Sequence, residues 1–332
     1  MPMINIEDVY ILDETGAEVD KVTGLFTKNE NATMGEKQMA RLNIAAGGSN
    51  NNLLDNWYFV GGGSQLGGGV FPINQRGQTS YSNGTNTTID RWKTEASSIS
   101  VDADGLTWTA TGDNNQFEQI IENYKLIEGE TYTATIDCDI SAGSARLFVG
   151  GVSSPWPTVA GSAVNVSSGI TSVTFTFARE SGYTGQYKLA LASVGGCTAK
   201  LRKFKLEKGT VSTLANDAPP NFGEELAKCQ RYLWFKTFSG NTPIGSGVAL
   251  TADQAIVSVV TPASMRPAQN ITLTANVLLV GNGQVATASA VTGINQYDNI
   301  ARLTLSSSGL TAYHTYSFFT TTETTMAIYA EL

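Results

Sequence analysis

Residues 130–141 read ETYTATIDCDIS, and this stretch decides the fold. Its alternate positions are apolar, namely Tyr132, Ala134, Ile136, Cys138 and Ile140. The positions between them are polar, namely Thr131, Thr133, Thr135, Asp137 and Asp139. Successive side chains of a β-strand point to opposite faces of the sheet. The period of two therefore predicts a strand with one face in a core and the other in solvent.

The same alternation recurs from about residue 70 to residue 208, for example at residues 173–177 and 187–191. Glycine and asparagine turns separate the alternating runs, and no helix of ordinary length fits between them. This pattern predicts two antiparallel sheets packed as a β-sandwich or jelly roll. The alternation breaks between Leu201 and Phe204, which predicts a β-bulge there.

Composition divides the chain into four segments, residues 1–50, 51–215, 216–234 and 235–332. The first is the most charged and contains a short predicted helix that begins near Thr33. The second is the predicted sandwich. The third joins a turn to a second short helix, capped by Asn221, with an apolar stripe of Phe222, Leu226, Cys229 and Leu233. The last is a second predicted β-sandwich, with strands at residues 248–250, 255–260, 271–280, 301–305, 313–320 and 326–332.

The composition argues against several classes of protein. Only 15% of the 332 residues are charged, against ~25% in a typical soluble domain, so uncharged polar side chains must cover much of the surface. A net charge of −8 argues against a nucleic-acid partner, which requires a basic face. No apolar run approaches the ~18 residues of a membrane span. Residues 1–5 lack the order of a signal peptide, so we expect synthesis inside a cell and no membrane partner.

Residues that could carry metal or covalent chemistry are few. The single histidine, His314, has no carboxylate near it in sequence before Glu323. Cys138 and Cys229 fall on apolar faces and are predicted to be core side chains. The sequence DADG at 102–105 begins like a calcium loop but lacks the later ligands, which favours a hairpin turn. We therefore predict no cofactor, no metal site, no catalytic residue and no enzymatic activity.

Two aromatic residues in predicted loops are candidates for carbohydrate binding. Sugars present hydroxyl groups and apolar CH faces, so their sites combine an aromatic ring with short polar side chains. Trp156 lies between two prolines, and Tyr183 lies in a glycine-rich turn. Either ring could serve as a platform for a sugar, or could instead pack over the rim of the sandwich.

Several blocks of sequence occur in an order that resembles a known family. They are NLLDNW at 52–57, PINQRG at 72–77, IDRW at 89–92, LEKG at 206–209, STLAND at 212–217 and ELAKCQRY at 225–232. The series resembles a module of tail-fibre and fibre-like proteins of phages and prophages of gut bacteria. EKQMARLNIAA at 36–46 is similar to the QARxNIGA element that often precedes it, with several usual residues replaced. We interpret IDRW as structural, with Asp90 and Arg91 paired and Trp92 in the core.

The resemblance implies a homotrimeric virion fibre protein. Its parts would be an N-terminal virion anchor at 1–50, a carbohydrate-binding-like jelly roll at 51–215 and a C-terminal tip domain at 235–332. Its partners would be a tail or capsid protein of the virion and a glycan of the host cell surface. The chain would be located in the virion after assembly in the bacterial cytoplasm. The side chains that three copies would bury around one axis are Met34, Met39 and Leu42.

Three functions are compatible with this sequence. The first is a receptor-binding fibre that recognises a host glycan, which the scarcity of catalytic residues and the modular resemblance favour. The second is a head fibre or capsid decoration protein with a mainly structural role. The third is a polysaccharide depolymerase, which the lack of a distinct carboxylate pair and of β-helix repeats disfavours.

Overall fold

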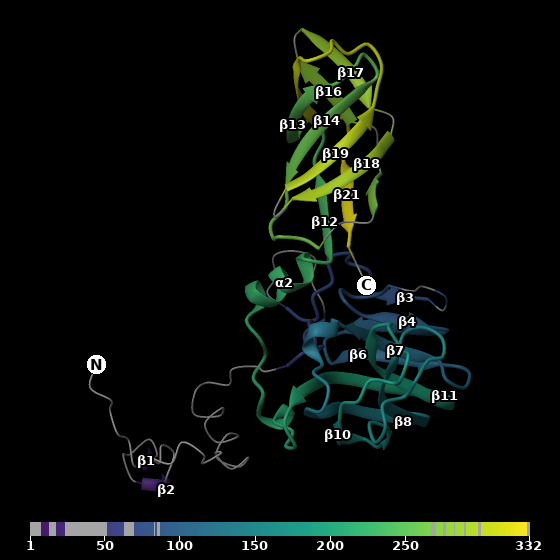
Figure 1. Cartoon of the computed structure of the whole chain (residues 1–332), viewed down its shortest axis with the longest axis vertical. Helices are drawn as coiled ribbons and strands as arrows, with labels where there is room; N and C mark the ends of the chain where they lie inside the picture. The colour runs from purple at the N-terminus through teal and green to yellow at the C-terminus, as the bar shows by residue number, and fades with distance from the viewer. Residues whose placement is uncertain are drawn as a thin grey trace.

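A computed structural model describes residues 8–12, 18–23, 52–62, 70–82, 84, 87–266, 270–274, 277–281, 283–288, 290–297 and 300–330. Near the N-terminus, β1 (Asp8–Leu12) and β2 (Glu18–Thr23) form an antiparallel hairpin. The predicted N-terminal helix, with Met34, Met39 and Leu42, lies outside the described residues. The prediction of a mainly β protein with a short connecting helix is confirmed (Figure 1).

The first domain is a β-sandwich of jelly-roll type built on two long strands, β8 (Thr131–Gly151) and β11 (Tyr187–Lys208). They pair antiparallel along nearly their whole lengths, and along its other edge β11 pairs with one strand at residues 187–192 and with another at residues 197–201. Those strands are β7 (Gln116–Ile121) and β6 (Gly105–Ala110). The remaining elements are β3 (Ser80–Tyr81), β4 (Lys93–Glu95), β5 (Ser97–Asp102), η1 (Asn123–Lys125), β9 (Val164–Val166), β10 (Gly169–Thr176) and η2 (Leu214–Asn216).

A close backbone approach allows this sheet to curl over its own core. The register of β8 and β11 shifts between Val194 and Cys197. There, a Cβ on Gly143 would lie only 2.1 Å from Gly196 O, so residue 143 must be glycine. The predicted bulge is confirmed by another register shift, between Leu201 and Lys203. The two halves of the curled sheet enclose one cluster of buried side chains.

The alternation in residues 130–141 is confirmed on one face and incomplete on the other. Tyr132, Ala134, Ile136 and Cys138 are buried, as predicted. Thr133 and Thr135 are buried as well, because the segment that leaves β11 returns across them. Thr133 donates to Gly209 O and Thr135 donates to Ser212 Oγ, each at 2.8 Å.

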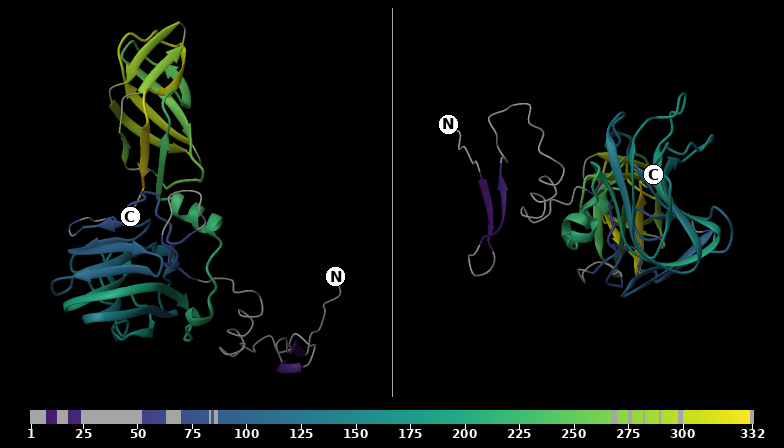
Figure 2. Two further views of the ribbon diagram at one scale, coloured as in Figure 1. Left: turned by 180° about the vertical axis from the view of Figure 1, so that it is seen from behind. Right: turned by 90° about the horizontal axis from the view of Figure 1, so that it is seen from below.

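The C-terminal domain is a second β-sandwich with its own cluster of buried side chains. Figures 1 and 2 show it stacked on the jelly roll along the long axis of the molecule. Its seven-stranded sheet has the order β17-β16-β20-β13-β14-β19-β18, and its three-stranded sheet has the order β12-β21-β15. The strands are β12 (Leu233–Phe238), β13 (Pro243–Ala249), β14 (Gln254–Val260), β15 (Asn270–Leu273), β16 (Val277–Gly281), β17 (Gln284–Ala288), β18 (Ala290–Tyr297), β19 (Ile300–Ser306), β20 (Thr315–Thr320) and β21 (Thr324–Tyr329).

Several elements near and within this domain differ from the sequence-based expectation, and β12, β17 and β18 were not predicted as strands. The connecting helix α2 (Phe222–Gln230) has Asn221 as its N-cap, as predicted. It ends before Leu233, which begins β12 because its backbone pairs with Tyr329. The single strand predicted at 271–280 is two strands, β15 and β16, which belong to different sheets. Periodicity alone cannot show where a strand changes sheet, because the alternation of faces continues on either side.

Sequence blocks 52–57, 72–77, 89–92 and 225–232 meet in one buried cluster between the jelly roll and α2. We call it the junction cluster. It comprises Asp55, Asn56, Ile73, Asp90, Arg91, Trp92, Gln119, Glu225 and Tyr232. Asn56 is its centre: its side chain donates to Ile73 O and to Asp90 O, each at 2.8 Å. Trp92 is buried as predicted and donates its indole N–H to Asn56 O.

The ion-pair partner of Arg91 corrects the sequence interpretation. Arg91 Nε lies 3.1 Å from Asp55 Oδ2, whereas Asp90 accepts hydrogen bonds from Gln75. Arg91 has a φ of 73°, so consecutive side chains on this turn diverge. The guanidinium also lies 3.4 Å from the centre of the Tyr232 ring, which adds a cation–π contact.

Contacts on both sides of α2 connect the jelly roll to the C-terminal domain. Gln75 Nε2 donates to Leu233 O at 2.7 Å, at the start of β12. Arg266 N donates to Arg231 O at 2.9 Å, and its side chain lies 3.8 Å from Glu122 Oε1. The two sandwiches are therefore joined through the segment that carries the ELAKCQRY block.

Candidate functional site

The loop between β8 and β9 presents Trp156 to solvent. This side chain is 64% exposed, whereas the other four tryptophans are buried. The backbone N–H of Trp156 donates to Ser153 O at 2.7 Å, which closes a tight turn. Trp156 has a φ of 51°, a left-handed conformation that bulky residues rarely adopt. An exposed indole on a backbone of this kind is a candidate binding platform, because such conformations cluster at functional sites.

Tyr183 does not offer its ring to a ligand: of the two alternatives that the sequence left open for it, the structure has the ring packed against the sandwich. Only 5% of the residue is exposed, and its ring packs edge-on against Tyr187 at 5.2 Å between centroids. Its hydroxyl accepts from Val152 N at 2.8 Å and from Ser153 N at 3.2 Å, and donates to Gln186 O at 2.8 Å. Tyr183 therefore fixes the first residues of the turn that carries Trp156. The two predicted residues lie at one site, with different roles.

Two glycines make room for Tyr183 beneath the turn. A Cβ on Gly151 would lie 2.6 Å from Pro157 Cδ and 2.7 Å from Tyr183 Cζ. A Cβ on Gly185 would lie 2.4 Å from the Tyr183 hydroxyl. Contacts this short do not occur between real side chains, so both positions require glycine. The loop 152–158 and the loop 178–186 are thus packed against each other as one unit, which we call the Trp156 loop pair.

The surroundings of Trp156 suit a neutral polar ligand. Ser153, Ser154 and Thr158 are exposed beside it, and their hydroxyl groups can donate or accept hydrogen bonds. A sugar ring placed on the indole would bury its CH face while its hydroxyl groups reach these side chains. The sequence identified Trp156 as a candidate. It could not assign Tyr183 its positioning role, although Gly182 and Gly185 flank that residue.

The residues considered for metal and cysteine chemistry lie in a turn and in the core. In the ranges that the structure covers, no group of three or more His, Cys, Asp and Glu side chains is placed to hold a metal ion. DADG at 102–105 forms the predicted hairpin turn between β5 and β6. Cys138 and Cys229 are buried as predicted, and burial raises the pKa of Cys138 to about 12. None of the helices in the described ranges is both long and apolar enough to cross a membrane.

Comparisons with known proteins give structural similarity only. No known family profile matches the chain, and no curated protein matches it. A structure entitled "CBM4 structure and function" is 16% identical and covers 41% of this chain and 93% of its own, with a TM-score of 0.28. The CBM22-1 xylan-binding domain of Paenibacillus barcinonensis Xyn10C is 13% identical and covers 40% of this chain and 94% of its own, with a TM-score of 0.28.

The N-terminal cellulose-binding domain of Cellulomonas fimi β-1,4-glucanase C is 17% identical. It covers 45% of this chain and 99% of its own, with a TM-score of 0.27. These similar structures are carbohydrate-binding modules. At such low TM-scores they do not assign a function to this chain.

Proposed function

We propose that this protein binds glycans at the Trp156 loop pair. One observation carries the proposal: a single tryptophan is exposed, and its turn is fixed from below by the buried hydroxyl of Tyr183. A protein that only needed a surface loop there would gain nothing from an exposed indole in a left-handed conformation. A ligand with an apolar face and hydroxyl groups would use both the ring and the neighbouring serine and threonine side chains.

The proposal also assigns the chain a location and a role in a phage particle. We infer a homotrimeric virion fibre protein, anchored through residues 1–50 and binding a glycan of the host surface for adsorption. The ordered blocks between residues 36 and 232, which resemble the fibre module, support this inference. Three linked copies would raise the avidity of weak sugar contacts ~10²–10⁴-fold where the geometry allows simultaneous binding.

A glycan array probed with the full chain tests the binding function. We expect binding to one class of host-surface glycan, and loss of that binding in Trp156→Ala. Tyr124→Ala is the matched control, because Tyr124 is 68% exposed in the same domain but lies outside the loop pair. Binding that survives in Trp156→Ala, or that fails equally in both variants, would contradict the proposed site.

Two further measurements test the fibre role. Sedimentation equilibrium of the full chain should give a trimer, and antibody labelling of intact virions should place the chain on a projecting fibre. A stable monomer would contradict the trimer. If the chain is a trimer and the antibody finds it on the virion, but it binds no host glycan, a structural decoration role would be favoured instead.

A further inference from the structure

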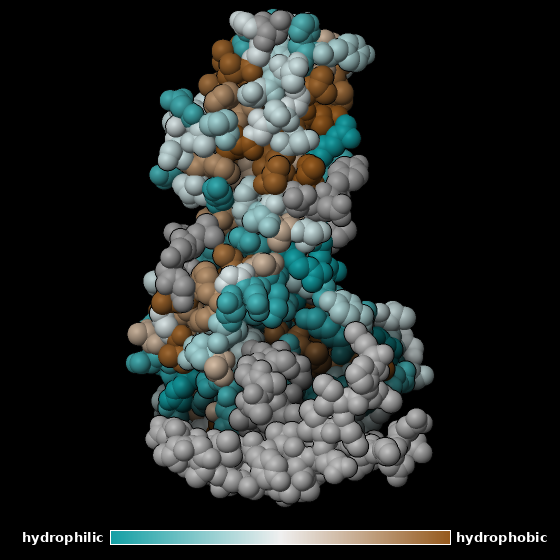
Figure 3. Space-filling view, turned by 90° about the vertical axis from the view of Figure 1, so that its left-hand side faces the viewer, coloured by the Kyte–Doolittle hydropathy of each residue, from teal (hydrophilic) through white to brown (hydrophobic). Residues whose placement is uncertain are grey.

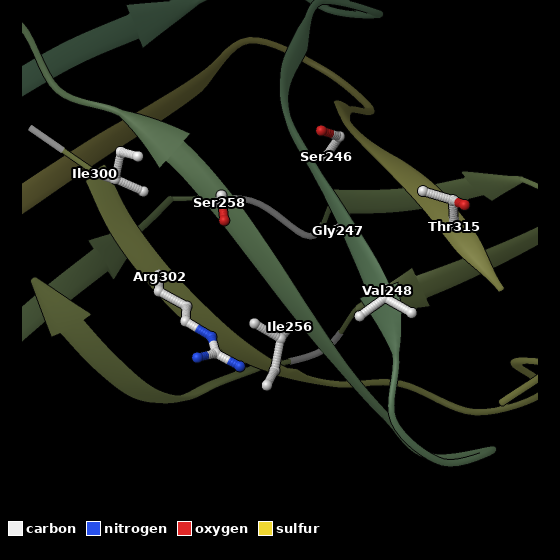
Figure 4. Close-up of a pocket in the computed structure, with 8 residues that line it drawn as sticks. All are labelled: Ser246, Gly247, Val248, Ile256, Ser258, Ile300, Arg302 and Thr315. Carbon is white, nitrogen blue, oxygen red and sulfur yellow. The ribbon is translucent and has the colours of Figure 1, made fainter. Parts of the chain in front are cut away.

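A depression of about 520 Å³ lies on the outer face of the seven-stranded sheet in the C-terminal domain. It is lined by Ser246, Gly247, Val248, Ile256, Ser258, Ile300, Arg302 and Thr315 (Figure 4). Its volume is in the range of small-ligand sites. It belongs to a different domain from the Trp156 loop pair. Any ligand bound in it would therefore be held independently of Trp156.

Strand register arranges the lining side chains in rows. Arg302 of β19 pairs with Ser258 of β14, which pairs with Ser246 of β13. Neighbouring strands lie ~4.8 Å apart, so the guanidinium and the two hydroxyl groups form one polar row across the sheet. The adjacent row along β14 and β13 contains Ile256 and Val248, which also pair. The depression thus has a row of polar side chains beside a row of aliphatic side chains.

Among the described residues that line the depression, Arg302 is the only charged one. No ion pair or hydrogen bond joins its side chain to another residue in the described ranges. A guanidinium stays protonated at every physiological pH and binds carboxylates through two parallel hydrogen bonds. In a chain with a net charge of −8, an arginine that pairs with no carboxylate of the described part of the chain is a ready site for an external anion.

The walls restrict the kind of anion. Val248 and Ile300 are partly exposed aliphatic side chains. Ile256 lies between Val248 and the extended arm of Arg302 (Figure 4). Figure 3 shows apolar and polar residues interspersed over the C-terminal domain. A small inorganic anion would satisfy Arg302 and could accept from the hydroxyl groups, but it would leave the aliphatic side chains unused. A sugar acid would use the cation, the hydroxyl groups and the aliphatic surface together.

We propose that this depression binds a carboxylate-bearing sugar residue of an acidic polysaccharide. The carboxylate pairs with Arg302, the sugar hydroxyl groups meet Ser246, Ser258 and Thr315, and the CH face lies on Ile256 and Val248. This inference goes beyond the proposed binding at Trp156, because it adds a second site in another domain with a different ligand class.

The test compares trigalacturonic acid with its methyl ester, which keeps the sugar and removes the charge. Binding to the full chain is followed by saturation-transfer NMR and isothermal titration. We expect the acid to bind about tenfold or more tightly than the ester, since hydrogen bonds to charged groups are the stronger ones. Arg302→Gln should abolish that preference, and Arg302→Lys should retain part of it.

Arg146→Gln is the matched control, because it removes one exposed positive charge from the jelly roll. It should keep the preference for the acid. Equal affinity for acid and ester, or a preference that survives in Arg302→Gln, would overturn the proposal. Inorganic phosphate that binds as tightly as the sugar acid would also overturn it, because the site would then select any anion.

Two outcomes separate this inference from the proposed function and from self-association. If Trp156→Ala loses the array glycan but keeps the preference for the acid, the two sites are independent, as we expect. If Arg302→Gln changes the sedimentation coefficient and leaves the acid preference intact, the face is an interface between copies, and the sugar-acid site is wrong.

Discussion

The junction cluster and the Trp156 loop pair are built from opposite kinds of sequence. The junction cluster uses the blocks that resemble a fibre module, and its side chains are buried and hydrogen-bonded to one another. The Trp156 loop pair carries no such block and presents one aromatic ring to solvent. The recognisable motif therefore marks the part that holds the domains together, while the candidate binding surface lies where the sequence is least distinctive. Loops tolerate change because few contacts constrain them, so ligand choice can vary there on a constant scaffold.

The largest expected effect is the loss of the buried ion pair in the junction cluster. Asp55→Ala leaves Arg91 buried without its carboxylate, which should lower the free energy of unfolding by about 3–5 kcal/mol. Urea unfolding followed by circular dichroism measures this. Asp139→Ala, which removes the exposed partner of Arg202, is the control and should change stability little. Equal effects of the two variants would show that the cluster is not what secures the junction.

Acid should weaken the same cluster. Burial alone would raise the pKa of Asp55, but the charges of Arg91 and Lys125 outweigh it and hold that pKa below its ordinary value. A carboxyl with a lowered pKa in the folded state stabilises the fold above its unfolded pKa of about 3.9, and this stabilisation is lost as the pH falls through the folded value. The urea concentration at the unfolding midpoint should therefore decrease as the pH drops below 4, and it should decrease less steeply in Asp55→Asn. Parallel pH profiles for the two proteins would contradict this role of Asp55.

A smaller loss is expected from overpacking the loop pair. Gly151→Ala puts a Cβ 2.6 Å from Pro157 Cδ and 2.7 Å from Tyr183 Cζ, which should cost about 1–3 kcal/mol. Glycan affinity should fall too, because Tyr183 fixes the turn beneath Trp156. Gly223→Ala in α2 is the control, since the nearest atom to a Cβ there is Asn221 Oδ1 at 3.4 Å. Unchanged stability and binding in Gly151→Ala would contradict the role of Tyr183 in positioning the turn that carries Trp156.

The smallest effect on stability should come from the residue that matters most for binding. Trp156 is largely exposed, so Trp156→Ala should change the free energy of unfolding by no more than about 0.5 kcal/mol. Thermal and urea unfolding of the variant check this. A large loss of stability would mean that the indole packs against the protein, and the contrast between a buried scaffold and a free platform would fail.

Sequence reasoning recovered the elements whose periodicity is local. The apolar face of β8, the cap at Asn221 and the bulge after Leu201 each depend on neighbouring residues, and each was confirmed. The predicted partner of Arg91 was wrong, because the carboxylate that binds it comes from a segment 36 positions away. Distant partners are set by the fold as a whole, and no local pattern encodes them.

The candidate sites show the same difference between residues marked by a local pattern and residues that only the fold brings together. Trp156 was found because prolines on both sides predict an exposed loop. The role of Tyr183 depends on backbone N–H groups of another loop, and the row of Arg302, Ser258 and Ser246 depends on strand register. The helix with Met34, Met39 and Leu42 remains a prediction, because it lies outside the described residues.

Tryptophan fluorescence offers the most direct test of where glycans bind. Trp156 is the one exposed tryptophan of five, so acrylamide quenching of the wild-type protein reports mainly on its indole. Adding the glycan selected on the array should protect the quenchable emission, and Trp156→Ala should show neither that emission nor the protection. A glycan that binds with full affinity while Trp156 stays as open to acrylamide as before would contradict the account.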